Sequence, residues 1–466
     1  MSGGPGVGRD SSVGRDSSVG GGDLEAICEE VLGLVGGRAD AAVTASHLRE
    51  GLTRFARSFI HQNVGDEHVA VTLDVVAGGR PASVTTTRVD RGSLGRLVEA
   101  ALSAAEVQPI DPTWAGLAPP APLLVGPDAG WDAETAGAGP AERAGVVADF
   151  VAACEGLEAA GYCETTAERL AFANSAGQRA TTALTSAAVD GIARQRGSDG
   201  VGSVLSARLG DLDGAGAGAR AASTARRAAD PIELPPGRYE VVLEPRCVAY
   251  MLDFLTVYGF NAKAVQEGRS FARLGEAQLD PALSIWDDAT DPRQPGPAFD
   301  AEGTPKRRVD LVVGGRVEGL AHDRRTAARA GTDSSGHAIP GGAVAGALAR
   351  HVFLDGAEHS PADQLVAGVE RGLLVRDFWY TRVLDPKTLV VTGLTRNGVF
   401  LVEKGEIGPA VGNLRFTQSP VAAFGPGQVL GVGDDAELAP GGLHVSWHHT
   451  PSLRLAGWNF TGNASG

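Results

Sequence analysis

Residues 53–63 form the stretch of the chain richest in side chains that could bind or orient another molecule. Apolar and polar residues roughly alternate there, which predicts a strand with one buried face. Its hydrogen-bonding side chains are those of Arg54, Arg57, Ser58, His61 and Asn63. Phe55, Phe59 and His61 share one parity, so we expect a half-buried His61 and an exposed Arg54. We expect Arg54, His61 and Asn63 to serve ligand binding or assembly.

A second group of such residues lies near the end of the chain, where His444, Ser446 and His448 alternate and His449 follows. On a strand, residues four apart lie about 13 Å from each other, because each residue adds ~3.3 Å. That distance is too long for two imidazoles to share a metal ion unless the strand bends. We expect these side chains to be polar groups at a surface or an interface.

Three further positions have a chemical and a plain structural interpretation. Ser335 and His337 supply a hydroxyl and an imidazole, but a catalytic triad needs a third orienting group, so we expect an ordinary loop. Cys247 follows Pro245 at the start of a predicted helix, and we expect a buried thiol rather than an activated one. Trp379 and Tyr380 fit an interface and the core equally well.

The composition limits the classes of function. The 41 Lys and Arg residues against 56 Asp and Glu give a net charge of −15 without any long basic run, which argues against nucleic-acid binding. The four cysteines form no CxxC pair and are expected to be reduced, buried thiols in a cytoplasmic protein. No apolar run approaches the ~18 residues that a membrane helix needs, so we expect no membrane partner.

The 466 residues are expected to form two folded domains behind a tail. Residues 1–22 repeat the hexapeptide Val-Gly-Arg-Asp-Ser-Ser and predict a disordered tail. Residues 23–230 predict an N-terminal α/β-layered domain with an antiparallel sheet. Its expected helices are 23–35, one from 90, 140–157 and 216–229, and its expected strands include 39–46, 51–62, 66–77 and 80–89.

Residues 231–466 predict a β-rich C-terminal domain, which makes the fold class α+β. A strand at 238–243 leads into a helix at about 246–258. Gly314-Gly315 predicts a hairpin, and so does the Asn397-Gly398 pair, which suits a type I′ turn between two apolar strands.

Several segments resemble one protein family. Residues 53–63 resemble the signature strand of the TldD/PmbA family, often labelled modulators of DNA gyrase. Residues 299–305, Phe-Asp-Ala-Glu-Gly-Thr-Pro, resemble the Asp-x-Glu-Gly-Thr-Pro segment of that family, and residues 372–386 and 399–407 resemble two of its later strands. The resemblance covers residues 24–455 in patches. It implies a subunit of a two-subunit zinc peptidase with a metallopeptidase-like C-terminal domain.

The active subunit of that family carries His-Glu-x-x-x-His on the first helix of its second domain. By the resemblance, this motif falls on Leu252, Asp253 and Val257, and no histidine lies between His68 and His322. The chain therefore resembles the PmbA (TldE) branch, which lacks the zinc motif. We expect no catalytic residue, no metal ligand and no cofactor in this chain, and zinc in its partner. A lone Asp253 is expected to be solvated or to cap the helix.

Three classes of function follow from this interpretation. The first is a non-catalytic partner subunit that forms a heterodimer with a zinc-motif TldD-like homologue and acts on unfolded peptides. The second is a self-sufficient hydrolase with an unrecognised nucleophile. The third is a binding or scaffold protein, so whether the chain is itself an enzyme stays open.

Overall fold

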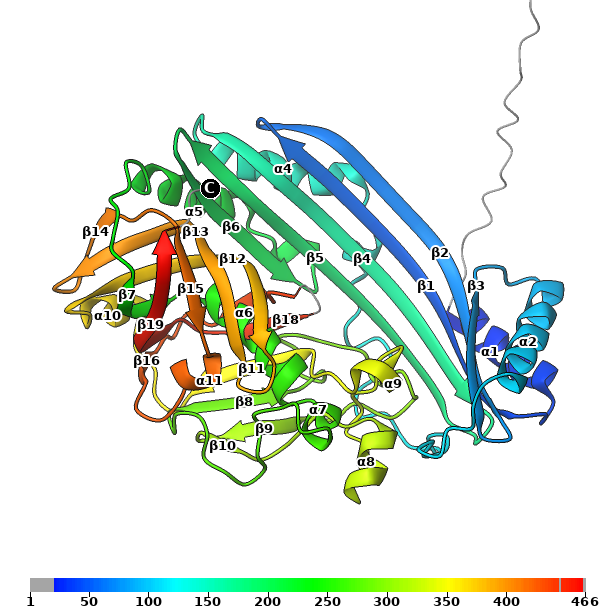
Figure 1. Cartoon of the computed structure of the whole chain (residues 1–466). Coiled ribbons are helices and arrows are strands. Elements are labelled where there is room, and N and C mark those ends of the chain that lie inside the picture. The colour runs from blue at the N-terminus through cyan, green and yellow to red at the C-terminus, as the bar shows by residue number, and fades with distance from the viewer. Residues whose placement is uncertain (1–20, 444–445, 464–466) are drawn as a thin grey trace, which may run out of the picture.

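The structure is a computed structural model that describes residues 21–443 and 446–463. It confirms the α+β class, with antiparallel sheets and a β-rich second half (Figure 1). The predicted disordered tail lies outside the described residues, apart from the start of the first helix. None of the helices in the described residues is long and apolar enough to cross a membrane.

The first half is built on one antiparallel sheet of long strands in the order β3-β2-β1-β4-β5-β6. Its strands are β1 (Asp40–Ala56), β2 (Phe59–Ala77), β3 (Arg80–Thr86), β4 (Glu158–Asn174), β5 (Arg179–Gln195) and β6 (Ser198–Ser206). Figure 1 shows the sheet running along one side of the molecule, with the second half on its inner face.

The helices of this half cover the opposite, outer face of the sheet. They are α1 (Gly21–Val35), α2 (Arg91–Glu106), α3 (Ala133–Gly137), α4 (Pro140–Ala153) and α5 (Gly214–Arg227), with a short turn η1 (Leu209–Asp211). Val43 of β1 packs in the core of α1 and α2, whereas Phe55 packs on Phe150 of α4. Because both β1 residues have odd numbers, the two helical layers share one face. Gly202 lets α5 approach β6, since a Cβ there would meet the Ala217 carbonyl oxygen at 1.9 Å.

The second half holds two sheets around a continuous hydrophobic core. The first has the order β10-β9-β8-β11-β18-β17 and the second runs β12-β7-β19-β15-β13-β14, with β16 also paired to β19. Their strands are β7 (Gly237–Leu243), β8 (Leu283–Asp287), β9 (Val309–Val313), β10 (Arg316–Val317), β11 (His351–Gly356), β12 (Arg371–Asp385), β13 (Val390–Glu403), β14 (Glu406–Ala410), β15 (Leu414–Gln418), β16 (Val429–Val432), β17 (Glu437–Pro440), β18 (Trp447–Thr450) and β19 (Leu453–Asn463).

One helix of the second half matters for the site. Helix α6 (Pro245–Phe254) begins with Pro at its first position and continues into a π-helical turn, η2 (Leu255–Gly259). All residues of α6 except Arg246 are buried, so it is a core helix between the two sheets. The remaining helices are short: α7 (Ala262–Gln266), α8 (Arg324–Ala330), α9 (Gly342–Ala345), α10 (Ala362–Ala367) and α11 (Pro420–Ala423).

The prediction of one strand over 51–62 is wrong. β1 ends at Ala56, and β2 begins at Phe59 and folds back along it. Arg57 and Ser58 form the hairpin tip with positive φ angles of 52° and 63°. Gly and Asn are the residues that usually adopt this left-handed conformation in a turn. Because neither stands at position 57 or 58, the sequence gave no sign of the turn.

The predicted hairpin at Asn397-Gly398 is also wrong, because β13 runs through both residues. Val375 pairs with Val399 and Asp377 with Arg396, so Asn397 and Gly398 together lie opposite one residue of β12. Their positive φ angles of 55° and 125° form a β-bulge within the strand. Asn397 and Gly398 adopt the positive φ angles that an Asn-Gly pair predicts. Because β13 pairs with β12 on both sides of them, they form a bulge instead of a turn. The hairpin at Gly314-Gly315 is confirmed between β9 and β10.

Candidate functional site

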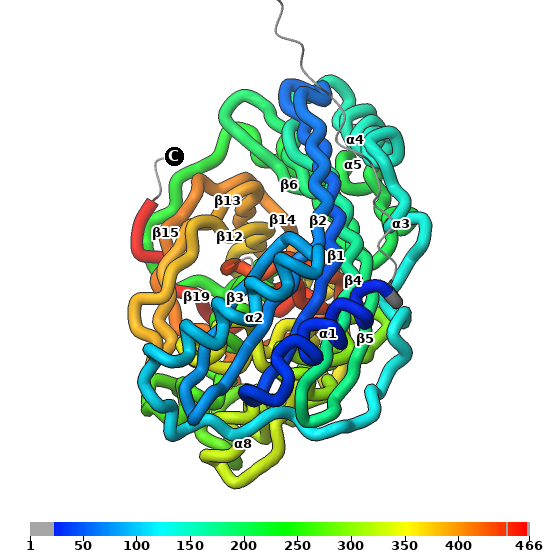
Figure 2. Tube along the Cα trace, turned by 90° about the vertical axis from the view of Figure 1, so that its right-hand side faces the viewer, coloured from blue at the N-terminus to red at the C-terminus, as the bar shows by residue number. Residues whose placement is uncertain are grey.

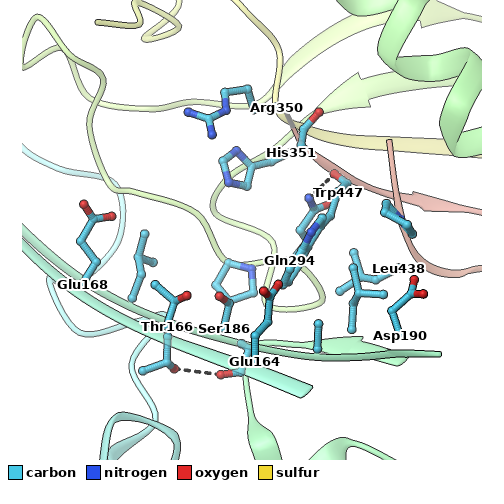
Figure 3. Close-up of a pocket in the computed structure, with 18 of the residues that line it drawn as sticks. Glu164, Thr166, Glu168, Ser186, Asp190, Gln294, Arg350, His351, Leu438 and Trp447 are labelled. Atoms are coloured by element: carbon cyan, nitrogen blue, oxygen red, sulfur yellow. Dashed lines mark hydrogen bonds between the residues drawn. The ribbon is translucent and has the colours of Figure 1, made fainter. Parts of the chain in front are cut away.

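A polar cleft of about 630 Å³ lies between the inner face of the first sheet and the second half of the chain (Figure 3). Strands β1, β4, β5 and β6 form one wall. The loop after β8, the starts of β11 and β18 with the residue before each, and β17 form the other. The main lining residues are Glu50, Tyr162, Glu164, Thr166, Glu168, Ser186, Asp190, Gln294, Arg350, His351, Leu438, Ser446 and Trp447.

The sheet wall of the cleft is acidic. Glu164, Thr166 and Glu168 are alternate residues of β4, so their side chains point to one face. Burial raises the pKa of Glu164, and the nearby carboxylates of Glu50 and Asp190 raise it further. Burial also raises the pKa of Glu168, although the Arg350 guanidinium opposes the shift. This wall therefore favours a ligand that brings positive charge or hydrogen-bond donors.

The opposite wall is held by buried hydrogen bonds. The Asp287 carboxylate at the end of β8 accepts the backbone N–H groups of Arg350 and His351 at 2.7 and 2.8 Å. Burial lowers the pKa of His351 to about 3, so its imidazole is neutral around pH 7. Gln294 Nε2 donates to the Trp447 carbonyl oxygen at 2.5 Å and ties a loop to β18. The wall is thus preformed and presents one cation, Arg350, opposite the carboxylates in Figure 3.

Asp253 of α6 lies in a buried cluster at the end of this cleft. Its Oδ1 contacts His448 Nε2 at 2.7 Å and accepts the Ser446 hydroxyl at 2.7 Å, while Oδ2 accepts the Leu443 N–H at 2.9 Å. Gly441 allows the loop to come this close, since a Cβ there would meet Asp253 Oδ2 at 2.0 Å. The expectations of a solvated Asp253 and a surface His448 are therefore wrong, because both residues are fully buried. His444 lies outside the described residues.

The Asp253 cluster contains the residue types of a catalytic triad without its connectivity. In a triad the carboxylate and the hydroxyl bind opposite nitrogens of the imidazole. Here Ser446 Oγ and Asp253 Oδ1 both approach His448 Nε2, at 3.2 and 2.7 Å, and the buried Nδ1 has no hydrogen-bond partner. His448 therefore cannot accept the Ser446 proton at one ring nitrogen while Asp253 orients it through the other.

A second buried cluster joins Ser335, His337 and Asp287. His337 Nε2 contacts Asp287 Oδ1 at 2.8 Å, and its Nδ1 lies 2.9 Å from Ser335 Oγ. The segment that we expected to be an ordinary loop thus brings Ser335 and His337 to a carboxylate, Asp287, which is the third group of a triad. Ser335 is only 3% exposed and its hydroxyl also accepts the His322 N–H, so no substrate reaches it. The cluster holds the loop in place.

Residues 252–257, where the resemblance puts the family's zinc motif, do not fit a metal ion. Leu252 is fully buried among apolar residues and Val257 follows it in η2, and neither has a ligating atom. The Asp253 carboxylate already accepts three hydrogen bonds. Across residues 21–443 and 446–463, no three His, Cys, Asp or Glu side chains are arranged to hold a metal ion. No catalytic step through zinc is derived for this chain.

The structure places Arg54, His61 and Asn63 on the β1–β2 hairpin, outside the cleft. Arg54 is exposed as expected, but the expected half-burial of His61 is wrong: His61 lies at a break in the β1–β2 register, and residues 59–67 are exposed whichever face they lie on. Asn63 Oδ1 accepts the Thr53 hydroxyl at 2.8 Å and lies 3.4 Å from Arg143 Nη2. Asn63 therefore contributes to the hairpin's own packing against α4.

Trp379 and Tyr380 are surface residues, with 46% and 63% of their areas exposed, so the core alternative is excluded. The Arg396 and Arg382 guanidinium groups lie over their rings at 4.4 and 4.1 Å. Cys247 is fully buried and burial raises its pKa well above the usual range, which confirms an unactivated thiol.

Sequence reasoning missed the cleft carboxylates. Tyr162, Glu164, Thr166 and Glu168 recur at every second residue of the sequence, a spacing that puts side chains on one face of a strand and was a readable signal. It also missed Arg246, whose guanidinium joins Asp190 of the first sheet at 2.7 Å to Asp377 of β12 at 3.0 Å. No sequence pattern links three charges so far apart in the chain.

Comparisons with known proteins agree on this architecture. Residues 236–462 match the family model of the PmbA/TldA metallopeptidase C-terminal domain. The fold matches TldE from Thermococcus kodakarensis with a TM-score of 0.83 at 16% identity, covering 94% of this chain and 100% of that chain. It matches a candidate modulator of a DNA gyrase from Thermotoga maritima with a TM-score of 0.81 at 17% identity, covering 94% and 100%. At these identities the matches show the fold alone.

A protein named metalloprotease from Methanothermobacter thermautotrophicus is 25% identical over 226 residues, which are 45% of this chain and 49% of the relative. The chain thus spans about half the length of this curated relative. The family-model match over the second half and the fold of the whole chain confirm the resemblance noted in the sequence. Residues 236–462 therefore belong to the PmbA/TldD family as its C-terminal domain, and the whole chain shares the fold of the two solved structures.

Proposed function

We propose that this chain is the non-catalytic partner subunit of a heterodimeric zinc metallopeptidase of the TldD/TldE type, which acts on unfolded peptides in the cytoplasm. The supporting observation is the interior of α6, which holds Leu252 and Asp253, the residues on which the resemblance puts the zinc motif. A buried leucine and a carboxylate with three hydrogen bonds leave no ligand set there. The chain itself then needs no cofactor, and the zinc belongs to a zinc-motif homologue.

In this proposal the cleft is the chain's contribution to substrate handling. An unfolded peptide offers backbone N–H groups, an ammonium terminus and basic side chains to Glu164, Glu168 and Asp190. Arg350 on the opposite wall favours a carboxylate or carbonyl oxygen of the same peptide. The cleft thereby retains peptide segments while the partner's zinc hydrolyses them.

A self-sufficient serine hydrolase is the second candidate, because Ser446 borders the cleft and lies beside His448 and Asp253. Its geometry argues against it, since the serine and the aspartate compete for one imidazole nitrogen. The third candidate, a scaffold without a peptidase partner, predicts no association with a zinc-motif homologue.

The deciding experiment purifies this chain, its zinc-motif homologue from the same genome and their mixture. Each is assayed on casein and on short unstructured peptides. We expect cleavage by the mixture, loss of cleavage with a chelator, and no cleavage by this chain alone. Chelator-resistant cleavage by this chain alone contradicts the proposal and favours the hydrolase. Absence of any association between the two chains favours the scaffold.

The role of the cleft has its own test. Glu164→Gln combined with Glu168→Gln removes two carboxylates from the cleft wall, and Glu158→Gln on the exposed start of the same strand is the matched control. We expect KM of the complex for a Lys-rich peptide to rise roughly threefold to tenfold, as a loss of about 1 kcal/mol implies. KM for an acidic peptide should not rise. Equal effects on both peptides contradict charge recognition.

A further inference from the structure

Three carboxylates of the cleft follow a regular spacing along β4. Glu164 and Glu168 lie on β4, and Glu50 of β1 pairs with Thr166, the residue midway between them. Figure 2 shows β1 and β4 running side by side along the molecule. Directly opposed residues of an antiparallel pair share one face, so all three carboxylates lie on the inner face, one every two residues or about 6.6 Å. We call Glu164, Glu50 and Glu168 the acidic row.

The members of the acidic row repel one another. Within the part of the chain that the structure describes, the side chains of Glu50 and Glu164 form neither a hydrogen bond nor an ion pair. Burial is the main cause that raises the pKa of Glu164 and of Glu168, and repulsion from Glu50 adds to it at both residues. Asp190 at the end of the same wall differs, because Arg246 binds its carboxylate at 2.7 Å. A ligand that brings cations to the row would remove this repulsion.

The opposite wall of the cleft points independently to a ligand that donates hydrogen bonds. Gln294 lines the cleft and is only 5% exposed, and Figure 3 shows it across from Glu164. Its Nε2 donates to the Trp447 carbonyl oxygen, which fixes the direction of the amide. Its buried Oε1 accepts no hydrogen bond from the described residues. Buried acceptors are normally satisfied, so an acceptor without a donor beside a cleft favours a donor from outside the chain.

We propose that the cleft selects an extended peptide segment that carries a basic side chain at every second residue. This inference rests on the proposed function in one respect, namely that the cleft holds peptide. An extended peptide lying along β4 advances by the same distance per residue as the strand, and its alternate side chains point to one side. Three basic side chains at positions i, i+2 and i+4 therefore match the three carboxylates of the acidic row one to one.

The intervening side chains of such a peptide face the opposite wall, which favours neutral groups. Gln294 and Trp447 carry no charge there, and burial keeps the imidazole of His351 neutral around pH 7. Arg350 adds a positive charge to this wall and disfavours a basic side chain beside it. A run of three adjacent basic residues turns only its first and third side chains to the acidic row. The same charge in a contiguous run therefore binds less tightly than in alternation.

Two labelled peptides of identical composition test the spacing on the purified full chain, without the zinc-motif homologue. One is Gly-Lys-Ser-Lys-Ser-Lys-Gly and the other is Gly-Ser-Lys-Lys-Lys-Ser-Gly. In fluorescence anisotropy we expect the alternating peptide to bind roughly twofold to fivefold more tightly, the gain that one further ion pair gives. Equal or tighter binding of the contiguous peptide overturns the proposal, and so does a lack of binding by both. Because this chain is measured alone, the result is separate from the cleavage that decides the proposed function.

A double-mutant cycle tests the middle position of the acidic row. In the wild-type chain, Ser in place of the central Lys of the alternating peptide should weaken binding roughly twofold to fivefold. In Glu50→Gln the same replacement should have little effect, whereas Glu158→Gln, at the exposed start of β4, should behave as wild type. The melting temperature of each variant reports that the fold is intact. An equal loss in Glu50→Gln and wild type overturns the proposal. Tighter binding of spermine than of the alternating peptide overturns it in favour of a small polyamine.

Discussion

The two buried carboxylate–imidazole–hydroxyl clusters contain the same residue types and differ in how they are connected. Around Asp287, both carboxylate oxygens and both nitrogens of His337 have partners. Around Asp253, the Nδ1 atom of His448 has no partner and Ser446 borders the cleft. Complete satisfaction is typical of a structural network, whereas a buried polar atom without a partner, such as His448 Nδ1, is an exception in folded proteins. Neither arrangement is a working triad.

The charges around the two clusters also differ. Burial alone would raise the pKa of Asp287, but Lys306 and His337 outweigh it and hold the pKa well below its usual range. Burial likewise opposes ionisation of Asp253, and His448, Ser446 and the Leu443 N–H lower its pKa more modestly. The Asp287 cluster is therefore expected to carry more of the folding stability.

The largest expected effect comes from removing Asp287. Asp287→Ala leaves the buried Lys306 and His337 without their anion, so we expect a loss of about 3–5 kcal/mol in the free energy of unfolding. Urea denaturation measures it. Asp310→Ala, on the exposed part of β9, is the control and should change stability by less than ~0.5 kcal/mol. A loss below about 1 kcal/mol would mean that the cluster does not stabilise the fold.

A loop that contacts the Asp287 cluster through the Ala338–Asp300 hydrogen bond contains a carboxyl with the opposite pH response. Burial, followed by repulsion from Asp300, raises the pKa of Glu302 to about 7. The folded state therefore keeps a proton that the unfolded chain releases near pH 4.5. The stability due to Glu302 is full below pH 4.5 and is lost as pH rises to about 7, by as much as ~3 kcal/mol. Glu302→Gln should remove this slope between pH 5 and 7. An unchanged slope would show that Glu302 ionises normally.

A smaller effect is expected at the Asp253 cluster. Asp253→Asn removes the charge beside His448 but keeps most of the shape, and we expect a loss of about 1–3 kcal/mol. Because the pKa of Asp253 is lowered in the folded state, the stability it gives is present above the unfolded pKa near 4 and is lost as pH falls below it. The double variant Asp253→Asn with His448→Gln measures the coupling of the pair. If Asp253→Asn lowered the free energy of unfolding by more than Asp287→Ala, the Asp253 cluster would be the more stabilising of the two.

Local signals in the sequence predicted most helices of the first half and where several of them begin. Asp90 caps α2 and the 3.6-residue apolar period of residues 24–34 gives α1. Local signals failed at the β1–β2 tip, where Arg57 and Ser58 adopt a left-handed conformation that residue type does not announce. They also failed at Asn397, whose amide donates to the buried Asp377 within a bulge.

The sequence by itself determined the α+β class, the resemblance to the TldD/PmbA family and the lack of a zinc motif on α6, because these depend on residue identity and short-range periodicity. Only the tertiary structure decided that Asp253 meets His448, that Asp190 and Asp377 share Arg246, and that the alternate residues of β4 line a cleft. Such contacts join residues far apart in the chain, and the free energy of burying a charge depends on neighbours that no local pattern specifies.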